Sequence, residues 1–260
     1  MRILFVGDVV GRPGRRILSQ RLQDLILDTN SDLTIVNCEN SAAGFGVTPD
    51  IAEALFEAGA DVLTSGNHIW DKRAILDYIA QQPRLLRPAN YPDAPGGGVY
   101  IGLSKQAVRY AVLNLQGRTY LPAINCPFRT ADTLLDDLGS DIPVRFVDFH
   151  AEATSEKMAF GWHLDGRVSA VVGTHTHVST ADERLLPGGT AYLTDVGMTG
   201  PIDSIIGMDR ETSLQRFLTG MPVRFEPATG RVRISAVVVD VQDSDGRALA
   251  IERRVVDSDA

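Results

Sequence analysis

The segment ILFVGD at residues 3–8 places four successive apolar residues directly before glycine and aspartate. A short apolar run that ends at a polar turn predicts a buried strand over Ile3–Val6. Pro13 then stands where a first helical turn would begin, and apolar side chains recur at helical spacing as far as Ile26. This part of the chain therefore predicts a strand, a loop that carries Asp8, and a helix that packs one face inward.

The same order of elements recurs through the first third of the chain. Leu33–Val36 is the second predicted strand, Thr48 is the expected N-cap of a helix through Ala58, and Asp61–Thr64 is the third strand. Strands that alternate with amphipathic helices are typical of a sheet with crossover helices. We therefore expect an α/β fold.

The rest of the chain predicts a helix near residues 131–138, a helical stretch around His163, and more strands. The strands are expected at Val99–Leu103, Arg109–Leu115, Val144–Phe149, Val168–Gly173, Val232–Val241 and Ala248–Val256. The first two should pair antiparallel, and the last two should form a closing hairpin around the turn-rich residues 243–246. Since no long linker interrupts the chain, we expect residues 1–260 to form a single domain.

The composition is that of a globular protein, with 44% hydrophobic and 22% charged residues. A formal net charge of -8 disfavours a stable complex with duplex nucleic acid, which Lys and Arg drive by displacing counterions, but it is compatible with a short or cyclic nucleotide. Residues 1–10 hold too short an apolar run for a signal sequence or a spanning helix. The two cysteines, Cys38 and Cys126, lack C-x-x-C spacing. These features predict a cytoplasmic protein with no membrane partner.

Side chains that can bind metal ions follow five of the predicted strands. The carboxyl ends of strands in open α/β sheets bring residues that are far apart in sequence into one crevice. Each residue alone has an ordinary structural explanation, such as a turn or a satisfied polar contact. Four of the five histidines lie at strand ends, however, and this clustering favours a metal site. The candidates are Asp8, Glu39, Asn40, Asn67, His68, His150, His175 and His177.

The types of these residues indicate the chemistry. His175 and His177 are two residues apart, so on an extended backbone both rings would project to the same side and serve adjacent ions. Glu39 and Asn40 are neighbours, so one could bridge two cations while the other makes a single contact. Oxygen ligands combined with imidazoles suit Mn, Fe or Zn. Two ions ~3.5–4 Å apart can generate a hydroxide and clamp a phosphoryl group, which predicts phosphoester hydrolysis.

His68 follows Asn67 directly, so we expect it at the rim of such a site. Its spacing fits a general acid or transition-state hydrogen-bond donor as well as it fits a structural hydrogen bond. A regulatory protein that binds a nucleotide or a partner at a metal-stabilised cleft would carry the same ligands. A metal-dependent deacetylase or amidase would also use histidine and aspartate ligands. The residues alone leave these alternatives open.

Motifs of other phosphate chemistries are absent from the sequence. There is no G-x-x-x-x-G-K-[ST] loop, no G-x-S-x-G elbow and no G-x-G-x-x-G segment after a strand. Residues 11–16 carry three arginines at a predicted helix start. They could attract an anion or simply initiate the helix and form a solvated basic end.

Taken together, the motifs resemble those of the calcineurin-like metallophosphoesterases, and more closely their YmdB-like branch, over nearly the whole chain. GNH at residues 66–68 and THTH at residues 174–177 fit the superfamily patterns G-N-H-[DE] and G-H-x-H. Val10 replaces the histidine of D-x-H, and NCENSA at residues 37–42 replaces G-D-x-x-D. Those departures, and DVGMTGP at residues 195–201, are similar to the YmdB-like branch.

The resemblance implies a four-layer αββα sandwich of two mixed β-sheets flanked by helices. It also implies two divalent transition-metal ions (Fe, Mn or Zn), His68 as an aid to catalysis, and in-line attack of a metal-bridging hydroxide on phosphodiesters, particularly 2',3'-cyclic nucleotides. The implied partner is a small nucleotide or phosphodiester substrate, and homo-oligomerisation is expected as well. The implied ligands are Asp8, Glu39, Asn40 and His177 for one ion, and Glu39, Asn67, His150 and His175 for the other.

Overall fold

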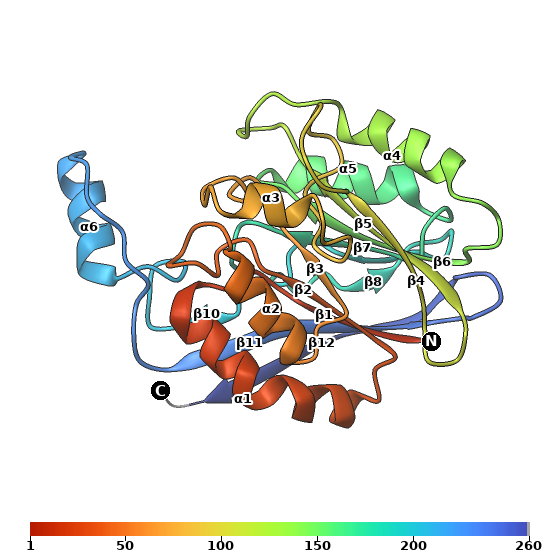
Figure 1. The fold of residues 1–260 in the computed structure, drawn as a ribbon, viewed down its shortest axis with the longest axis horizontal. Helices are drawn as coiled ribbons and strands as arrows, with labels where there is room; N and C mark the ends of the chain where they lie inside the picture. The colour runs from red at the N-terminus through yellow and green to blue at the C-terminus, as the bar shows by residue number, and fades with distance from the viewer. Residues whose placement is uncertain (259–260) are drawn as a thin grey trace.

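The computed structural model describes residues 1–258, and strand β1 (Arg2–Val6) lies inside the first of two stacked sheets (Figure 1). β1 pairs in parallel with β2 (Leu33–Asn37), which pairs in parallel with β3 (Val62–Thr64). Helices α1 (Gly11–Thr29) and α2 (Pro49–Glu57) make the crossovers between these strands. The predicted order of strand, loop and helix is thus confirmed for the first third of the chain.

The end of the chain completes the first sheet. β11 (Val232–Val241) pairs antiparallel with β1, and β12 (Ala248–Ser258) pairs antiparallel with β11 in the predicted closing hairpin. The short strand β10 (Gly200–Pro201) pairs with the start of β11. β1 therefore lies between a neighbour close in sequence and a neighbour from the last part of the chain.

The second sheet has the order β4-β5-β6-β7-β9-β8. Its central strands β5, β6, β7 and β9 are parallel, and both edge strands are antiparallel to their neighbours, as predicted for β4 and β5. The strands are β4 (Val99–Leu103), β5 (Arg109–Gln116), β6 (Val144–His150), β7 (Ala170–Thr174), β8 (Arg184–Leu185) and β9 (Ala191–Leu193). Both sheets are therefore mixed.

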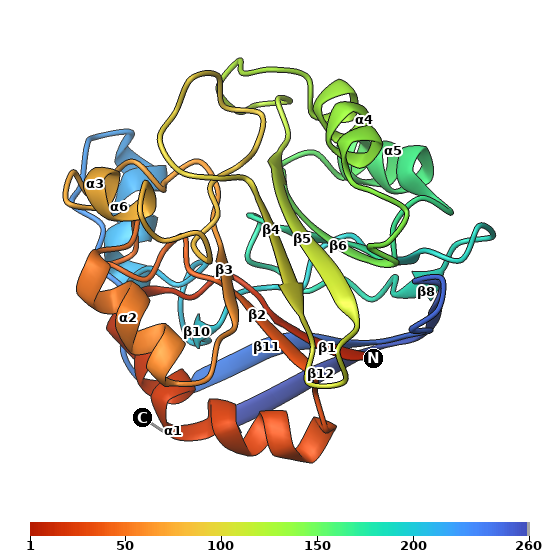
Figure 2. The same ribbon diagram turned by 45° about the vertical axis from the view of Figure 1, so that its right-hand side comes forward.

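Helices cover the outer face of each sheet. Figure 2 shows α4 (Pro127–Asp137) and α5 (Thr154–Leu164) side by side on the second sheet, with α1 and α2 on the opposite side of the molecule. α3 (Ile75–Ile79) packs in the same apolar cluster as α1 and α2. α6 (Arg210–Thr219) extends away from the two sheets in Figure 1.

The apolar core explains why the first strand has no polar residue after Arg2. Ile3 and Phe5 point into the layer between the two sheets, whereas Leu4 and Val6 point toward the helices. Successive side chains of a strand face opposite sides, so a strand covered on both faces must be apolar throughout. The rings of Phe5 and Phe146 lie 5.2 Å apart across the layer between the sheets. Burying each such side chain contributes about 1.5–3 kcal/mol.

The structure confirms the predicted four-layer αββα sandwich of two mixed sheets flanked by helices. The helix expected near residues 131–138 begins earlier, at Pro127, where a proline suits the first turn. The sequence did not predict α3, α6 or the two- and three-residue strands β8, β9 and β10. The predicted domain, residues 1–260, includes residues 259 and 260, which lie outside the described residues. No helix within residues 1–258 is long and apolar enough to cross a membrane.

Candidate metal centre

The predicted ligands lie on loops or strand ends from both sheets. Asp8 follows β1, Glu39 follows β2 and Asn67 follows β3, whereas His150 ends β6 and His175 follows β7. Parallel strands end at the same edge of a sheet, which brings these residues together although they are far apart in sequence. A cavity of about 360 Å³ opens at this edge. Its lining includes Glu39, Asn40, His68, Glu152, His175 and His177.

Hydrogen bonds behind His150 fix which of its ring nitrogens carries the proton. Nδ1 lies 2.9 Å from the hydroxyl oxygen of Thr174, and that hydroxyl donates to Asp148 Oδ1 at 2.7 Å. Because the hydroxyl proton is used, Nδ1 must be the donor in its bond to Thr174. Burial lowers the pKa of His150 well below its usual value, so the ring is neutral. Nε2 is therefore an unprotonated nitrogen.

Three other acceptor atoms surround this nitrogen. Glu39 Oε2 lies 2.9 Å away, and Asn67 Oδ1 lies 3.2 Å away. Nδ1 of His175 lies 3.0 Å away, while Nε2 of the same ring lies 2.9 Å from the carboxylate of Glu152. Burial lowers the pKa of His175 to about 2, and the neutral ring that suits Glu152 has its proton on Nε2. Four lone-pair atoms then converge, and a cation would bring them together.

His177 and Asn40 form a second pair of facing acceptors. Nδ1 of His177 donates to the carbonyl oxygen of Ile206 at 2.9 Å, and burial lowers the pKa of this histidine. Its unprotonated Nε2 lies 3.3 Å from Asn40 Oδ1. The amide of Asn40 is oriented by its Nδ2, which donates to the carbonyl oxygen of Gly44 at 3.0 Å. His177 Nε2 and Asn40 Oδ1 are thus two further lone-pair atoms that face each other.

The two carboxylates of the site are almost completely buried. Asp8 is 0% exposed and Glu39 is 1% exposed. Burial raises the pKa of Asp8 well above its ordinary value and raises that of Glu39 to about 7. Within residues 1–258, Asp8 Oδ1 and Glu39 Oε2 have no hydrogen-bond partner. Such carboxylates are costly to bury unless a cation neutralises them.

Gly66 leaves the space that the converging atoms occupy. A Cβ atom at this position would lie 1.8 Å from Glu39 Oε2 and 2.3 Å from His150 Nε2. The atoms of Glu39, His150 and His175 that could ligate a metal ion all lie within 4.8 Å of one another. Oxygen and imidazole donors with this spacing fit a divalent metal ion.

His68 lies at the rim, as predicted. Its backbone N–H donates to Glu39 Oε1 at 3.2 Å, and its ring Nδ1 lies 2.9 Å from Asp71 Oδ2. The ring of Phe45 packs edge-on against the imidazole, with 5.0 Å between the ring centres. His68 therefore makes a structural hydrogen bond and also lines the cavity.

One geometric expectation is wrong. β7 ends at Thr174, and His175 and His177 have φ angles of 96° and 65°, so the backbone of the H-x-H pair is not extended. Residues other than glycine rarely adopt positive φ angles. Such a backbone conformation is kept only where the surrounding structure imposes it. The two rings diverge, His175 toward His150 and His177 toward Asn40.

A buried ion pair supports this turn and was not predicted. Lys157 Nζ donates to the carbonyl oxygen of Thr174 at 2.7 Å and to Asp195 Oδ2 at 2.6 Å. Asp195 Oδ2 also accepts from the backbone N–H and the hydroxyl of Thr176. Asp148 and Glu152 were missed as well, although a charged residue inside the predicted Val144–Phe149 strand was a signal for Asp148.

Comparisons with known proteins show which family the chain belongs to. The profile of the family described as YmdB-like protein matches residues 4–254. The chain is 52% identical over 261 residues to the 2',3'-cyclic-nucleotide 2'-phosphodiesterase of Bacillus subtilis (strain 168), covering 100% of this chain and 98% of that protein.

Two solved structures are similar over nearly their whole length. One, a hypothetical protein from Thermus thermophilus, has a TM-score of 0.93 and 43% identity, with 99% of each chain covered. The other, described as a novel phosphatase from Mycoplasma pneumoniae, has a TM-score of 0.94 and 34% identity, covering 100% of this chain and 94% of that one. The resemblance inferred from the motifs is confirmed, and the chain belongs to the YmdB-like protein family.

Proposed function

We propose that this chain is a metal-dependent phosphodiesterase that hydrolyses 2',3'-cyclic nucleotides at a centre of two divalent transition-metal ions, Mn, Fe or Zn. The observation that carries the proposal is the convergence of atoms that can ligate a cation around His150 Nε2, at distances of 2.9–3.2 Å. The phosphodiesterase and phosphatase descriptions of its relatives support the reaction class. The cavity of about 360 Å³ suits a small nucleotide.

The proposed ligands divide into two sets that share Glu39. His177 and Asn40 face each other. Asn67, His175 and Glu39 each contact His150. We assign Asp8 to the first set, as the family resemblance implies; its Oδ2 accepts from the backbone N–H of His175, and its Oδ1 has no hydrogen-bond partner within residues 1–258. The first set is Asp8, Glu39, Asn40 and His177, and the second is Glu39, Asn67, His150 and His175.

The bound ions would polarise the phosphoryl oxygens and stabilise the charge that develops on them. In the reaction, water adds to phosphorus, the bond from phosphorus to one ribose oxygen breaks, and that oxygen takes a proton. His68 is the proposed proton donor, because it lines the cavity and Asp71 Oδ2, 2.9 Å from its Nδ1, orients the ring. The product is a phosphomonoester.

Phosphorus NMR on 2',3'-cyclic AMP tests the reaction. We expect the cyclic diester signal to be replaced by a monoester signal, and replacing Glu39 by glutamine should abolish both turnover and bound metal. Glu57→Gln is the control, since Glu57 is a carboxylate at the end of α2, outside the cavity. Saturable binding of the nucleotide with no monoester would instead favour a regulatory binding protein, and release of an acyl product from an amide would favour an amidase.

We further propose that residues 1–260 work as one domain in the cytoplasm on a small diffusible substrate. One apolar layer joins the two sheets, which supports cooperative unfolding as a unit. A single calorimetric transition is expected, and two separate transitions would contradict it. Homo-oligomerisation stays a prediction, which analytical ultracentrifugation of the whole chain would check.

A further inference from the structure

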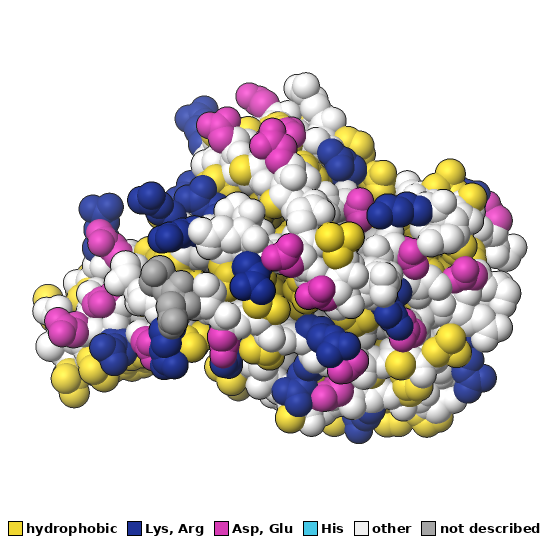
Figure 3. All heavy atoms as spheres, turned by 90° about the horizontal axis from the view of Figure 1, so that it is seen from below, with side chains coloured by type: hydrophobic (Ala, Val, Ile, Leu, Met, Phe, Trp, Pro, Cys, Tyr) yellow, Lys and Arg dark blue, Asp and Glu magenta, His cyan; other side chains and the backbone are white. Residues whose placement is uncertain are grey.

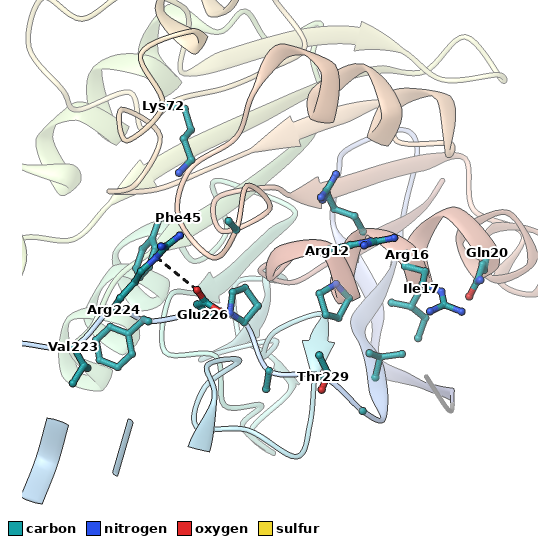
Figure 4. Close-up of a pocket in the computed structure, with 18 residues that line it drawn as sticks. Arg12, Arg16, Ile17, Gln20, Phe45, Lys72, Val223, Arg224, Glu226 and Thr229 are labelled. Atoms are coloured by element: carbon teal, nitrogen blue, oxygen red, sulfur yellow. Dashed lines mark ion pairs between the residues drawn. The ribbon is translucent and has the colours of Figure 1, made fainter. Parts of the chain in front are cut away.

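A second cavity, of about 940 Å³, lies between the start of α1 and residues 223–230 (Figure 4). Its volume is near the upper end of the range of about 300–1,000 Å³ that is usual for ligand sites. Five cationic side chains and one anionic side chain line it, and we call it the arginine groove. The charged residues are Arg12, Arg15, Arg16, Lys72, Arg224 and Glu226.

Most of the cations in the arginine groove are not neutralised by the protein. Within residues 1–258, Arg12, Arg16 and Lys72 form no ion pair, and the buried Nε of Arg15 has no hydrogen-bond partner. Among the groove cations, only the exposed Arg224 has a carboxylate within ion-pair distance in the described part of the chain: Glu226, at 3.6 Å. In a chain with a net charge of -8, unpaired cations gathered in one cavity indicate an anionic ligand.

The surroundings of α1 strengthen this field. The first turn of α1 contains no acidic residue, and its N-cap Val10 offers no side-chain acceptor. The positive end of the helix dipole is therefore not compensated locally. In the space-filling view, Lys and Arg side chains gather where the segment that carries α6 joins the rest of the molecule (Figure 3).

The arginine groove is continuous with the candidate metal centre. Phe45 and Phe225 line both cavities. Phe45 also packs edge-on against His68. Figure 4 shows Lys72 and Arg224 at the end of the groove where Phe45 lies, and Arg12 and Arg16 further along, on α1. A ligand that begins at the metal centre would pass two aromatic rings and then a row of cations.

We propose that the arginine groove binds the backbone phosphates of a single-stranded oligoribonucleotide whose 3'-terminal 2',3'-cyclic phosphate is opened at the metal centre. This inference rests on the proposed function and extends its substrate from mononucleotides to RNA ends. Sites for single strands combine a positive groove with aromatic side chains on which bases stack, and Phe45 and Phe225 supply such rings. The reaction is unchanged: water adds to phosphorus and one ribose oxygen leaves with a proton.

Kinetics on two substrates test the inference. We compare 2',3'-cyclic AMP with a five-nucleotide RNA that ends in a 2',3'-cyclic phosphate, and expect the RNA to have the higher kcat/KM. Phosphate contacts from Arg12 and Arg16 alone would contribute about -1.4 to the salt slope, so raising the salt from 50 to 200 mM should lower kcat/KM for the RNA by at least about sevenfold. The mononucleotide, which does not reach the groove, should respond less.

The double variant R12Q/R16Q removes two of the five groove cations and should make the salt slope shallower by about 1.4 and weaken the preference for RNA, leaving turnover of 2',3'-cyclic AMP unchanged. Both residues are exposed, so the fold should tolerate the change. Arg21→Gln is the matched control, because Arg21 lies on the same helix but outside the groove. Equal kcat/KM values for the two substrates, or equal loss for both in R12Q/R16Q, would overturn the proposal.

Binding separates this proposal from the proposed function. Fluorescence anisotropy of a labelled RNA with a 3'-phosphate end should show weaker binding to R12Q/R16Q than to the wild type, whether or not cyclic AMP is hydrolysed. If the RNA binds but no cyclic nucleotide is hydrolysed, the proposed function is refuted while the groove remains an RNA-binding site. A glutamate decapeptide that binds as tightly as the RNA, or an RNA that binds both proteins equally, would refute the groove as an RNA site.

Discussion

Replacing Thr174 by valine should weaken metal binding while leaving the fold in place. The substitution keeps the branched shape of the side chain and removes the hydroxyl that joins His150 Nδ1 to Asp148. Without the Thr174 hydroxyl, no acceptor holds the proton on His150 Nδ1, so the tautomer with an unprotonated Nε2 is no longer favoured. Residues that orient a metal-binding histidine in this way usually change metal affinity by about 10–100-fold, or roughly 1.4–2.8 kcal/mol.

The stability cost is expected to be moderate. Asp148 keeps its bonds from Asn37 Nδ2 and Thr64 Oγ1, so the buried carboxylate loses one of three partners. Losing one partner of a buried polar group costs about 1–3 kcal/mol. A domain of this size loses roughly 2–4 °C in Tm for each kcal/mol, so the variant should remain folded at 25 °C.

Isothermal titration of Mn²⁺ into metal-free protein measures the effect. Thr190→Val is the matched control, because the Thr190 hydroxyl is also buried and donates to the carbonyl oxygen of Val168 at 2.7 Å, away from the candidate ligands. Thr174→Val should bind Mn²⁺ about 10–100-fold more weakly than Thr190→Val. Equal affinities in the two variants would refute the role assigned to the Thr174 hydroxyl.

Three further predictions concern the same centre. Gly66→Ala should eliminate measurable metal binding, because its Cβ would overlap Glu39 Oε2, whereas Gly97→Ala, with no contact under 3.6 Å, should bind normally in the same titration. Lys157→Met should lower the free energy of unfolding by about 3–5 kcal/mol, because it leaves the buried carboxylate of Asp195 without its cationic partner. An unchanged urea midpoint would contradict a stabilising role for this ion pair. Mn²⁺ at about 100 times its Kd should stabilise the wild type by about 2.7 kcal/mol and raise Tm by roughly 5–11 °C, with no such rise for Glu39→Gln.

Features that depend on local pattern could be predicted from the sequence. The apolar run Ile3–Val6 followed by Asp8 determined both a buried strand and the position of a carboxylate at its end. The same local logic placed Asn67 and His150 after strands. Because parallel strands share one edge, the covalent order of these residues was enough to bring them into one site.

Features that depend on tertiary contacts could not be predicted. Lys157 and Asp195 are 38 residues apart, and nothing in either segment indicates that the two meet beneath the H-x-H turn. The left-handed backbone of His175 and His177 was missed because spacing alone favoured an extended strand. The arginine groove required residues 223–230 to lie opposite the start of α1, which is far earlier in the chain.

The pairing of β1 with β11 constrains how the protein is made. Phe5 pairs with Val237, so the second edge of β1 stays uncovered until the β11–β12 hairpin has been synthesised. At about 5–20 residues per second, this interval lasts roughly 12–46 s on the ribosome. Throughout it, β1 presents an uncovered edge of the kind that recruits other chains, and translation that stalls before residue 232 should yield an aggregating fragment instead of a partially active enzyme.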